Sequence, residues 1–215
     1  RFAIPILVAT VCLFPALAAA AERYALMNVN VFDGASERIR EDAVVLVEDG
    51  RIEAIGDRRT SIPEGFEVID GEGNYLMPGL FDVHTHLDTI ERAGRALASG
   101  VTTVRSASVN AYEDVALREM VRAGRLAGPE MLAAGVYVTP NLGDTVLADP
   151  RLVELADGVT SDEQLRLLVD VNASRGVDVI KTRGTQRAGL PDTDPRQQVY
   201  TERQLGVIVE RAAEH

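Results

Sequence analysis

Strand-like and helix-like segments alternate along the chain after the Pro78-Gly79 turn, and this alternation constrains the fold more than any other feature. Four consecutive strand-then-helix units predict an α/β fold in which helices cover a parallel sheet. A (β/α)₈ barrel and a doubly wound open sheet both fit this pattern, so both stay open. The predicted strands span residues 80–86, 101–106, 131–138 and 177–181, and the predicted helices span 89–99, 111–126, 160–176 and 201–215.

Capping signals set the predicted starts of three of these helices. A side-chain oxygen at the cap accepts from a backbone N–H of the first turn, and a Glu or Gln three residues later returns the bond. Gly128-Pro129 predicts the end of the second helix. The three predicted pairs are Asn110 with Glu113, Thr160 with Glu163, and Thr201 with Gln204.

The segment before Pro78 has the pattern of short β-strands. Apolar-rich runs cover residues 24–31, 43–47 and 51–55. Asp49-Gly50 lies between the last two runs, and an Asp-Gly pair in this place predicts a tight hairpin turn.

Residues 2–20 are uncharged and apolar, follow Arg1, and end in small residues of the Ala-x-Ala kind. This pattern predicts a bacterial-type signal peptide over residues 1–21, hence an exported protein in the periplasm or outside the cell. A membrane anchor is the alternative. Pro5 and Pro15 interrupt the stretch and it is barely long enough to span, so we expect no stable membrane insertion after cleavage.

Composition limits the classes of partner and of metal site. With 46% hydrophobic and 26% charged residues, the chain can bury the core of one or two domains. The net charge of −11 and the scarcity of aromatic residues argue against nucleic acid as a partner. Cys12 is the only cysteine and lies in the predicted signal peptide, so a metal would need ligands other than thiolate.

Two of the three histidines, His84 and His86, lie two residues apart in a predicted strand. Side chains alternate between the faces of a strand, so both imidazoles point the same way from Cα atoms ~6.6 Å apart. One ion at ~2.0 to 2.1 Å from each nitrogen fits this spacing. Asp82 shares the face. The alternative is a pair of polar histidines on a half-exposed strand.

Lys181 is the only lysine among 22 basic side chains and ends the fourth predicted strand. Arginine cannot lose its proton in a protein, whereas desolvation lowers the pKa of a lysine and makes the amine a nucleophile. The sequence therefore predicts a chemical role for this amine. A compositional accident at a surface position is the alternative.

Two long connections, residues 139–159 and 182–200, follow the third and fourth predicted strands. Loops of this length are usually functional or mobile. Arg183, Arg187 and Arg196 lie in the second loop and could bind a substrate carboxylate through bidentate hydrogen bonds. A solvated loop is the alternative.

Several segments of the chain resemble the amidohydrolase superfamily of metal-dependent hydrolases, in its imidazolonepropionase-like and Xaa-Pro-dipeptidase-like branch. The run from Asn74 to Leu87, with Pro-Gly-Leu-Phe-Asp-Val-His-Thr-His at its centre, is the most specific part. The other matching segments are Val31-Phe32-Asp33-Gly34, Asp49-Gly50-Arg51-Ile52, Val101-Thr102-Thr103-Val104-Arg105 and Asp178-Val179-Ile180-Lys181.

The resemblance implies a (β/α)₈ barrel of the TIM type beside a small β-sandwich domain. Residues 22–78 would form the N-terminal part of the sandwich and residues 79–215 the first four β/α units of the barrel. Eight units need about 200 to 250 residues, so we expect an N-terminal fragment that is truncated before the fifth barrel strand.

The resemblance also implies a metal site. His84 and His86 match two ligands of the first metal ion, and Lys181 matches a lysine that is carboxylated by carbon dioxide and bridges two divalent ions. The ions would be zinc, or manganese, iron or cobalt, which accept nitrogen and oxygen ligands. Asp82 would lie behind the ligands and support them rather than bind metal itself.

Such a site implies hydrolysis of amide bonds in small molecules, peptides or cyclic amides, by a metal-bound hydroxide. Family members add two histidines and an aspartate from later strands, and His215 at a helix end is a poor substitute. We therefore expect the fragment alone to be inactive. Alternatives are a mononuclear deaminase, which would not need Lys181, and a catalytically silent exported binding protein without metal. A homo-oligomer stays open.

Overall fold

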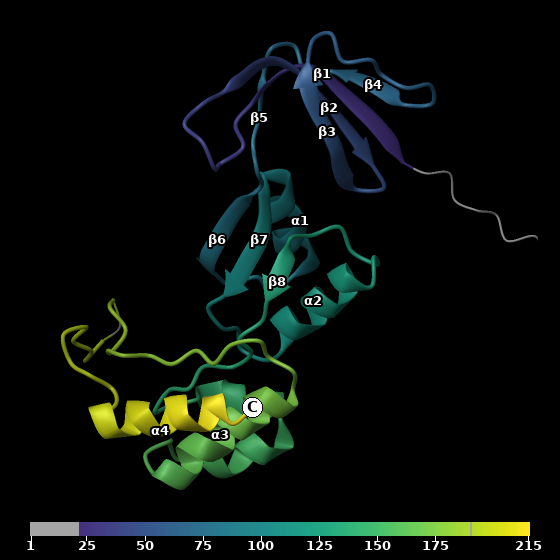
Figure 1. Ribbon diagram of the computed structural model, residues 1–215. Helices are drawn as coiled ribbons and strands as arrows, with labels where there is room; N and C mark the ends of the chain where they lie inside the picture. Colours follow the sequence, from purple (N-terminus) through teal and green to yellow (C-terminus); the bar gives the residue numbers. More distant parts are fainter. Residues whose placement is uncertain (1–21, 190) are drawn as a thin grey trace, which may run out of the picture. The chain divides into compact units, whose positions relative to one another are not determined.

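The computed structural model describes residues 22–189 and 191–215, so the predicted signal peptide lies outside the described residues. The chain divides into two compact units, Arg1–Pro78 and Gly79–His215 (Figure 1). None of the helices in the described part of the chain is long and apolar enough to cross a membrane.

The first unit is a five-stranded sheet. The strand order is β3-β2-β1-β4, and β5 pairs with the other end of β1. The β1–β2 and β2–β3 pairs are antiparallel, whereas β4 and β5 run parallel to β1. The bounds are β1 Arg23–Val31, β2 Arg40–Glu48, β3 Arg51–Asp57, β4 Glu67–Asp70 and β5 Tyr75–Leu76.

The hairpin between β2 and β3 is the one that the sequence predicts. Asp49 and Gly50 have φ angles of 50° and 73°, and two consecutive positive values are those of the turn whose twist matches paired strands. Alternation along β2 then places Ala43 and Val45 in one small core and Val44 with Leu46 in another, on opposite faces.

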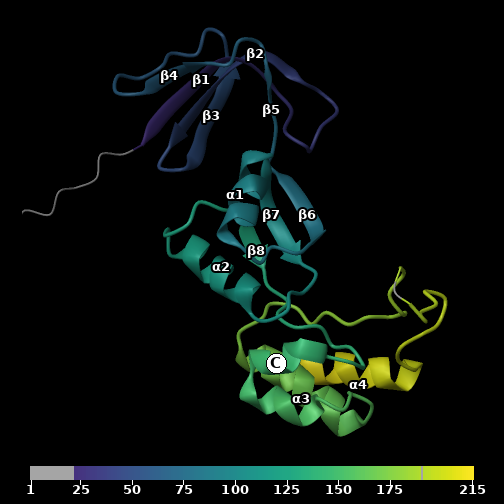
Figure 2. The same ribbon diagram turned by 180° about the vertical axis from the view of Figure 1, so that it is seen from behind.

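The second unit begins with three parallel strands that alternate with helices (Figure 2). The parallel sheet with helical cover is therefore confirmed for the first three β/α repeats. The elements are β6 Leu80–Thr85, α1 Ile90–Ala98, β7 Val101–Ser106, α2 Glu113–Arg122, β8 Glu130–Leu132, the 3₁₀ helices η1 Gly143–Ala148 and η2 Pro150–Leu155, and the helices α3 Asp162–Ser174 and α4 Glu202–Ala213.

The strand order of the described residues can be compared with the two sheet types that the sequence leaves open. The order β6-β7-β8 is sequential, and beyond β8 a parallel bridge joins Val138 to Thr182. The fourth segment therefore lies beside the third. In the doubly wound order 3-2-1-4 the fourth strand would lie beside the first, so this part of the chain departs from that topology.

Of the predicted strands in this unit, the third is shorter than expected and the fourth does not form. The third ends at Leu132 instead of Val138, because side-chain carboxylates bind the next backbone amides: Asp178 accepts from Ala133 N at 2.7 Å, and Asp114 accepts from Ala134 N at 2.9 Å. Residues 177–181 form no strand. Among the described residues this segment makes no ladder, and the isolated bridge between Val138 and Thr182 lies directly after it.

The helix boundaries are partly as predicted. The Thr201–Gln204 capping box of α4 is confirmed. The box of α3 lies one residue later than predicted, because Ser161 takes the extended cap conformation. The Asn110 cap of α2 is wrong, since the helix begins after Tyr112 without a side-chain cap. It ends at Arg122, before a left-handed Gly124 with φ 65°, rather than at the predicted Leu126.

Candidate functional site

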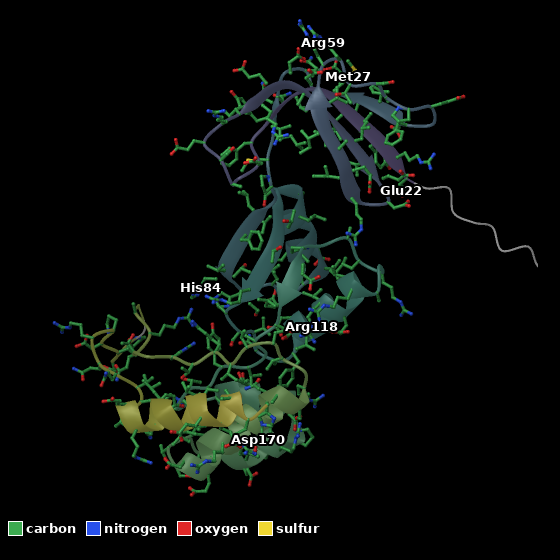
Figure 3. All side chains as sticks on the ribbon, in the orientation of Figure 1. Glu22, Met27, Arg59, His84, Arg118 and Asp170 are labelled. Atoms are coloured by element: carbon green, nitrogen blue, oxygen red, sulfur yellow. The ribbon has the colours of Figure 1, made fainter. Side chains whose placement is uncertain are left out.

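His84 lies near the carboxyl end of β6 (Figure 3). His86 follows directly after the last residue of this strand. Their ring centroids are 5.6 Å apart and the ring planes make an angle of 81°. Both side chains are exposed. Two imidazoles at this separation can each place a nitrogen ~2.1 Å from a shared divalent ion.

The tautomer of His86 follows from its hydrogen bonds. Its Nδ1 lies 2.7 Å from the backbone carbonyl oxygen of Ser108. A carbonyl only accepts, so Nδ1 carries the hydrogen and donates it, and in the neutral ring Nε2 then has a free lone pair. The hydroxyl of Tyr137 lies farther from Nδ1, at 3.4 Å. A metal-binding histidine commonly has this arrangement, in which the ring nitrogen that does not bind metal donates to a carbonyl.

Lys181 lies in the same cleft as the two histidines. The cleft has a volume of about 610 Å³, and its lining includes His84, His86 and Lys181. His84 and Lys181 also line a second cavity of about 280 Å³. Segments far apart in the sequence thus bring two imidazoles and the one amine to a common space.

Backbone pairing fixes which side chains of the Lys181 segment share a side. Val138 N donates to the Lys181 carbonyl at 2.9 Å, and Arg183 N donates to the Val138 carbonyl at 3.3 Å. Thr182 is therefore the bridged residue, and Lys181 and Arg183 flank it with the same orientation. Lys181 and Arg183 are half-buried and line the cleft.

The charged groups of the cleft are mainly cationic. Arg183 stacks on the Tyr137 ring, with its guanidinium carbon 4.6 Å from the ring centroid, and Arg187 is exposed at the cleft. Within the described ranges neither arginine has an ion-pair partner. The one carboxylate of the lining, Asp88, is bound to Arg92 at 2.6 Å. Arg183 and Arg187 can therefore accept an anionic group from a ligand.

Three other residues considered in the sequence analysis, Asp82, Arg196 and His215, do not line the cleft. Asp82 turns back on its own strand, where its carboxylate accepts from His84 N at 3.0 Å, and it does not line the cleft. Arg196 forms a bidentate pair with Asp194, and this pair lowers the Asp194 pKa. His215 ends the chain beyond α4 with its ring 2.9 Å from Asp170, so it is no part of the cleft.

The side chains of the cleft supply only part of the ligands that a metal centre needs. Counting residues 22–189 and 191–215, no three His, Cys, Asp or Glu side chains lie close enough to hold a metal ion. The cleft does offer two nitrogen donors from β6, one with a fixed tautomer, and an amine from Lys181. Carboxylation of this amine would add two oxygen donors to the set. Further ligands would have to come from outside the described residues.

Two residues of the site escape prediction from the sequence. Tyr137 follows the third strand at the edge of the sheet where the histidines lie, and its position at a strand end is the signal that could have found it. Ser108 contributes a backbone carbonyl from a left-handed conformation with φ 84°. Nothing in its residue type indicates that conformation.

A buried polar network supports the loop that carries part of the cleft lining. Asp149 in this loop is 2% exposed and binds Arg151 at 2.8 Å and Arg175 at 2.7 Å. These guanidinium groups, Arg151 first, hold the pKa of Asp149 far below its usual range. Burial and the nearby Asp149 charge raise the pKa of Tyr112, which stacks with Arg175, to about 12.

Comparison with known proteins places the chain among hydrolases. No family model matches the chain. The imidazolonepropionase of Aromatoleum aromaticum is 31% identical over 159 residues, which are 72% of this chain and 34% of that protein.

Solved structures match over nearly the whole chain. A Bifidobacterium longum protein assigned as a prolidase is 31% identical with a TM-score of 0.69, covering 90% of this chain and 47% of that protein. A Xaa-Pro dipeptidase with methionine bound in its active site has a TM-score of 0.74 at 20% identity, and the match covers 89% of this chain and 54% of the dipeptidase. The chain thus spans about half the length of these structures.

Proposed function

Because the chain belongs to the amidohydrolase superfamily, we propose that the intact protein is a metal-dependent hydrolase of carbon–nitrogen bonds in small molecules. Amide bonds of dipeptides or of cyclic amides are the proposed substrates, since the chain is similar to a prolidase and an imidazolonepropionase. The convergence of His84, His86 and Lys181 on one cleft is the observation that carries the proposal.

The proposed architecture is the first half of a (β/α)₈ barrel beside a small β-sandwich. The sequential order of β6, β7, β8 and the Thr182 segment supports the barrel, since consecutive barrel strands are neighbours. The cleft then lies beyond the carboxyl ends of the strands, where barrel enzymes place their sites.

We assign His84 and His86 to the first of two divalent ions. Lys181 would bridge both ions as a carbamate: its amine nitrogen forms a bond to the carbon of carbon dioxide, and a proton leaves the nitrogen. Two divalent metal ions, when bound, would polarise the scissile carbonyl and lower the pKa of a water molecule. The free Nε2 lone pair of His86 is the one this assignment requires.

Arg183 and Arg187 would bind a carboxylate of the substrate. Both guanidinium groups line the cleft without an ion pair in the described chain, and a planar guanidinium binds a carboxylate through two parallel hydrogen bonds. The Tyr137 ring would hold Arg183 in place through stacking. An unchanged kcat/KM for carboxylate-bearing substrates in Arg187→Ala would remove Arg187 from this role.

The test is hydrolysis of Xaa-Pro dipeptides and cyclic amides by the intact protein with added zinc, manganese or cobalt. We expect His84→Ala to lower kcat/KM by at least about 100-fold, because it removes a metal ligand. His215→Ala is the matched control, since His215 lies at the α4 end beside Asp170 and should leave turnover unchanged. Equal activity of wild type and His84→Ala would overturn the proposal.

A mononuclear deaminase is the second candidate, because His84 and His86 would serve one ion without a bridging group. Lys181→Ala separates the two, since it should abolish the binuclear enzyme and only weaken a mononuclear one. An exported binding protein is a third candidate, and it predicts no bound metal.

We also propose export of the protein with removal of residues 1–21. The uncharged apolar run and the alanines before Glu22 support this proposal. Peptide sequencing of the protein from the periplasm or medium should give an N-terminus near Ala21. An N-terminus that retains residues 2–20 would contradict it.

A further inference from the structure

Ser108 adopts a backbone conformation that serine rarely takes. Its φ is 84°, it is 1% exposed, and it follows β7 at the edge of the cleft. A non-glycine residue in this region carries strain that the surrounding structure must offset, and such residues gather at functional sites. Its hydroxyl is buried without a partner among the described residues, so a hydroxyl hydrogen bond does not explain the conformation.

Hydrogen bonds on both sides of Ser108 fix its conformation. Ala107 N donates to the Thr85 carbonyl of β6 at 2.7 Å, and Ser108 N donates to the Ser106 hydroxyl at 3.2 Å. Val109 N donates to the Gly135 carbonyl at 2.9 Å. Three consecutive amides are thus bound.

The peptide unit between Ser108 and Val109 connects Gly135 to His86. In a trans peptide the carbonyl and the N–H point in opposite directions. The N–H of this unit binds Gly135, and its carbonyl accepts from His86 Nδ1 at 2.7 Å. The backbone dihedrals of Ser108, including its positive φ, orient this unit.

Tyr137 is the competitor for the same ring nitrogen. Its hydroxyl lies 3.4 Å from His86 Nδ1 and can donate if Nδ1 has no hydrogen. That arrangement would move the ring hydrogen to Nε2 and remove the lone pair. Whichever partner binds Nδ1 more closely therefore decides which nitrogen can bind a metal ion.

We propose that Ser108 is a positioning residue for His86: its left-handed backbone holds the carbonyl against Nδ1, excludes the Tyr137 hydroxyl as donor, and keeps Nε2 free. The inference rests on the proposed function only in taking the Nε2 ligand to be a metal ion. A side chain no larger than serine and unbranched at Cβ should preserve this arrangement, and β-branched side chains should disrupt it.

The experiment is long-range ¹H–¹⁵N NMR of the histidine rings in the intact protein, before and after chelation, at a mildly alkaline pH where imidazole is neutral. We expect the chelated wild type to show the Nδ1–H tautomer for His86. Ser108→Ala removes only the hydroxyl and should keep this tautomer and the zinc affinity. A wild-type His86 with its hydrogen on Nε2 would overturn the inference, whatever the variants do.

Ser108→Thr retains the hydroxyl and adds one methyl group on Cβ. We expect it to shift His86 toward the Nε2–H tautomer and to weaken zinc binding by about 10- to 100-fold. Tyr137→Phe in the Ser108→Thr background removes the competing donor and should restore part of the Nδ1–H population. An unchanged tautomer in folded Ser108→Thr contradicts the inference. Failure of every form to bind zinc, with the tautomer as expected, would instead count against the proposed function.

Discussion

Arg183 occupies the cleft as a guanidinium without a counter-ion among the described residues. Stacking on the Tyr137 ring orients it, and the bridge at Thr182 fixes its backbone beside Lys181. An oriented and unpaired guanidinium loses little side-chain entropy when a carboxylate binds. This residue therefore provides a direct test of substrate charge.

We expect Arg183→Ala to raise KM for a carboxylate-bearing substrate by about 10- to 100-fold, the cost of charged hydrogen bonds of about 1.5 to 3 kcal/mol. The same substrate with its carboxylate amidated should show little change. Arg125→Ala is the control, since Arg125 is exposed and does not line the cleft. Steady-state kinetics measure KM for both substrates. An equal rise in KM for the two would contradict carboxylate binding.

Individual residues of the site can be predicted from the sequence when their side-chain chemistry or spacing is unusual. Residues that act through their backbone cannot. His84, His86 and Lys181 are recognisable because their spacing or rarity is unusual. Ser108 is a common residue type, and its φ of 84° depends on partners in β6 and at Gly135. Tertiary contacts of this kind leave no local signal.

Among the elements, the break after β8 shapes the cleft. Gly135 has φ 63°, and a Cβ there would lie 2.7 Å from Asn172 Oδ1 and 2.8 Å from carbon atoms of Tyr112 and Val177. Asp114 accepts from Gly135 N at 3.0 Å. The chain can therefore bend at this point toward Tyr137.

Gly135→Ala should destabilise the intact protein by about 2 to 4 kcal/mol, because strain at a positive φ adds to overpacking. Gly143→Ala is the matched control: its φ is 53°, but no atom lies within 4 Å of the added Cβ, so only about 1 kcal/mol is expected. Urea unfolding measures both variants. Equal effects would show that the packing around Gly135 is not tight.

The ion pairs of Asp149 should make the stability of the second unit depend on pH. The folded-state pKa of Asp149 is lowered, so its contribution is present above about pH 4, the usual range of an aspartate, and is lost as the pH falls below it. Asp149→Asn should cost about 2 kcal/mol near neutral pH. Thermal unfolding should show this difference shrinking steadily as the pH falls below about 4 toward the lowered folded-state pKa, and a constant difference would contradict the account.

Element boundaries show where local signals suffice. The Asp49-Gly50 hairpin and the α4 capping box depend on residues close in sequence, and both are confirmed. The predicted strand 177–181 does not form a ladder, because the amides of the neighbouring segment, from Ala133 to Val136, are bound by side chains, and a strand needs a paired neighbour as well as an apolar pattern.

For the whole molecule, the sequence pattern predicts the α/β class and the parallel pairing of the strands. It does not predict the complete site. The cleft holds two imidazoles and one amine, fewer donors than two metal ions require. The chain also spans about half the length of the solved structures it resembles. We therefore expect the remaining ligands to come from outside the described residues.

The metal content of the intact protein, measured by elemental analysis in wild type and in Lys181→Ala, tests the central claim that the histidine pair and Lys181 serve one cluster. We predict about two divalent ions per chain in wild type and about one or none in Lys181→Ala, with thermal unfolding showing that the variant is folded. The same metal content in both forms would contradict the account.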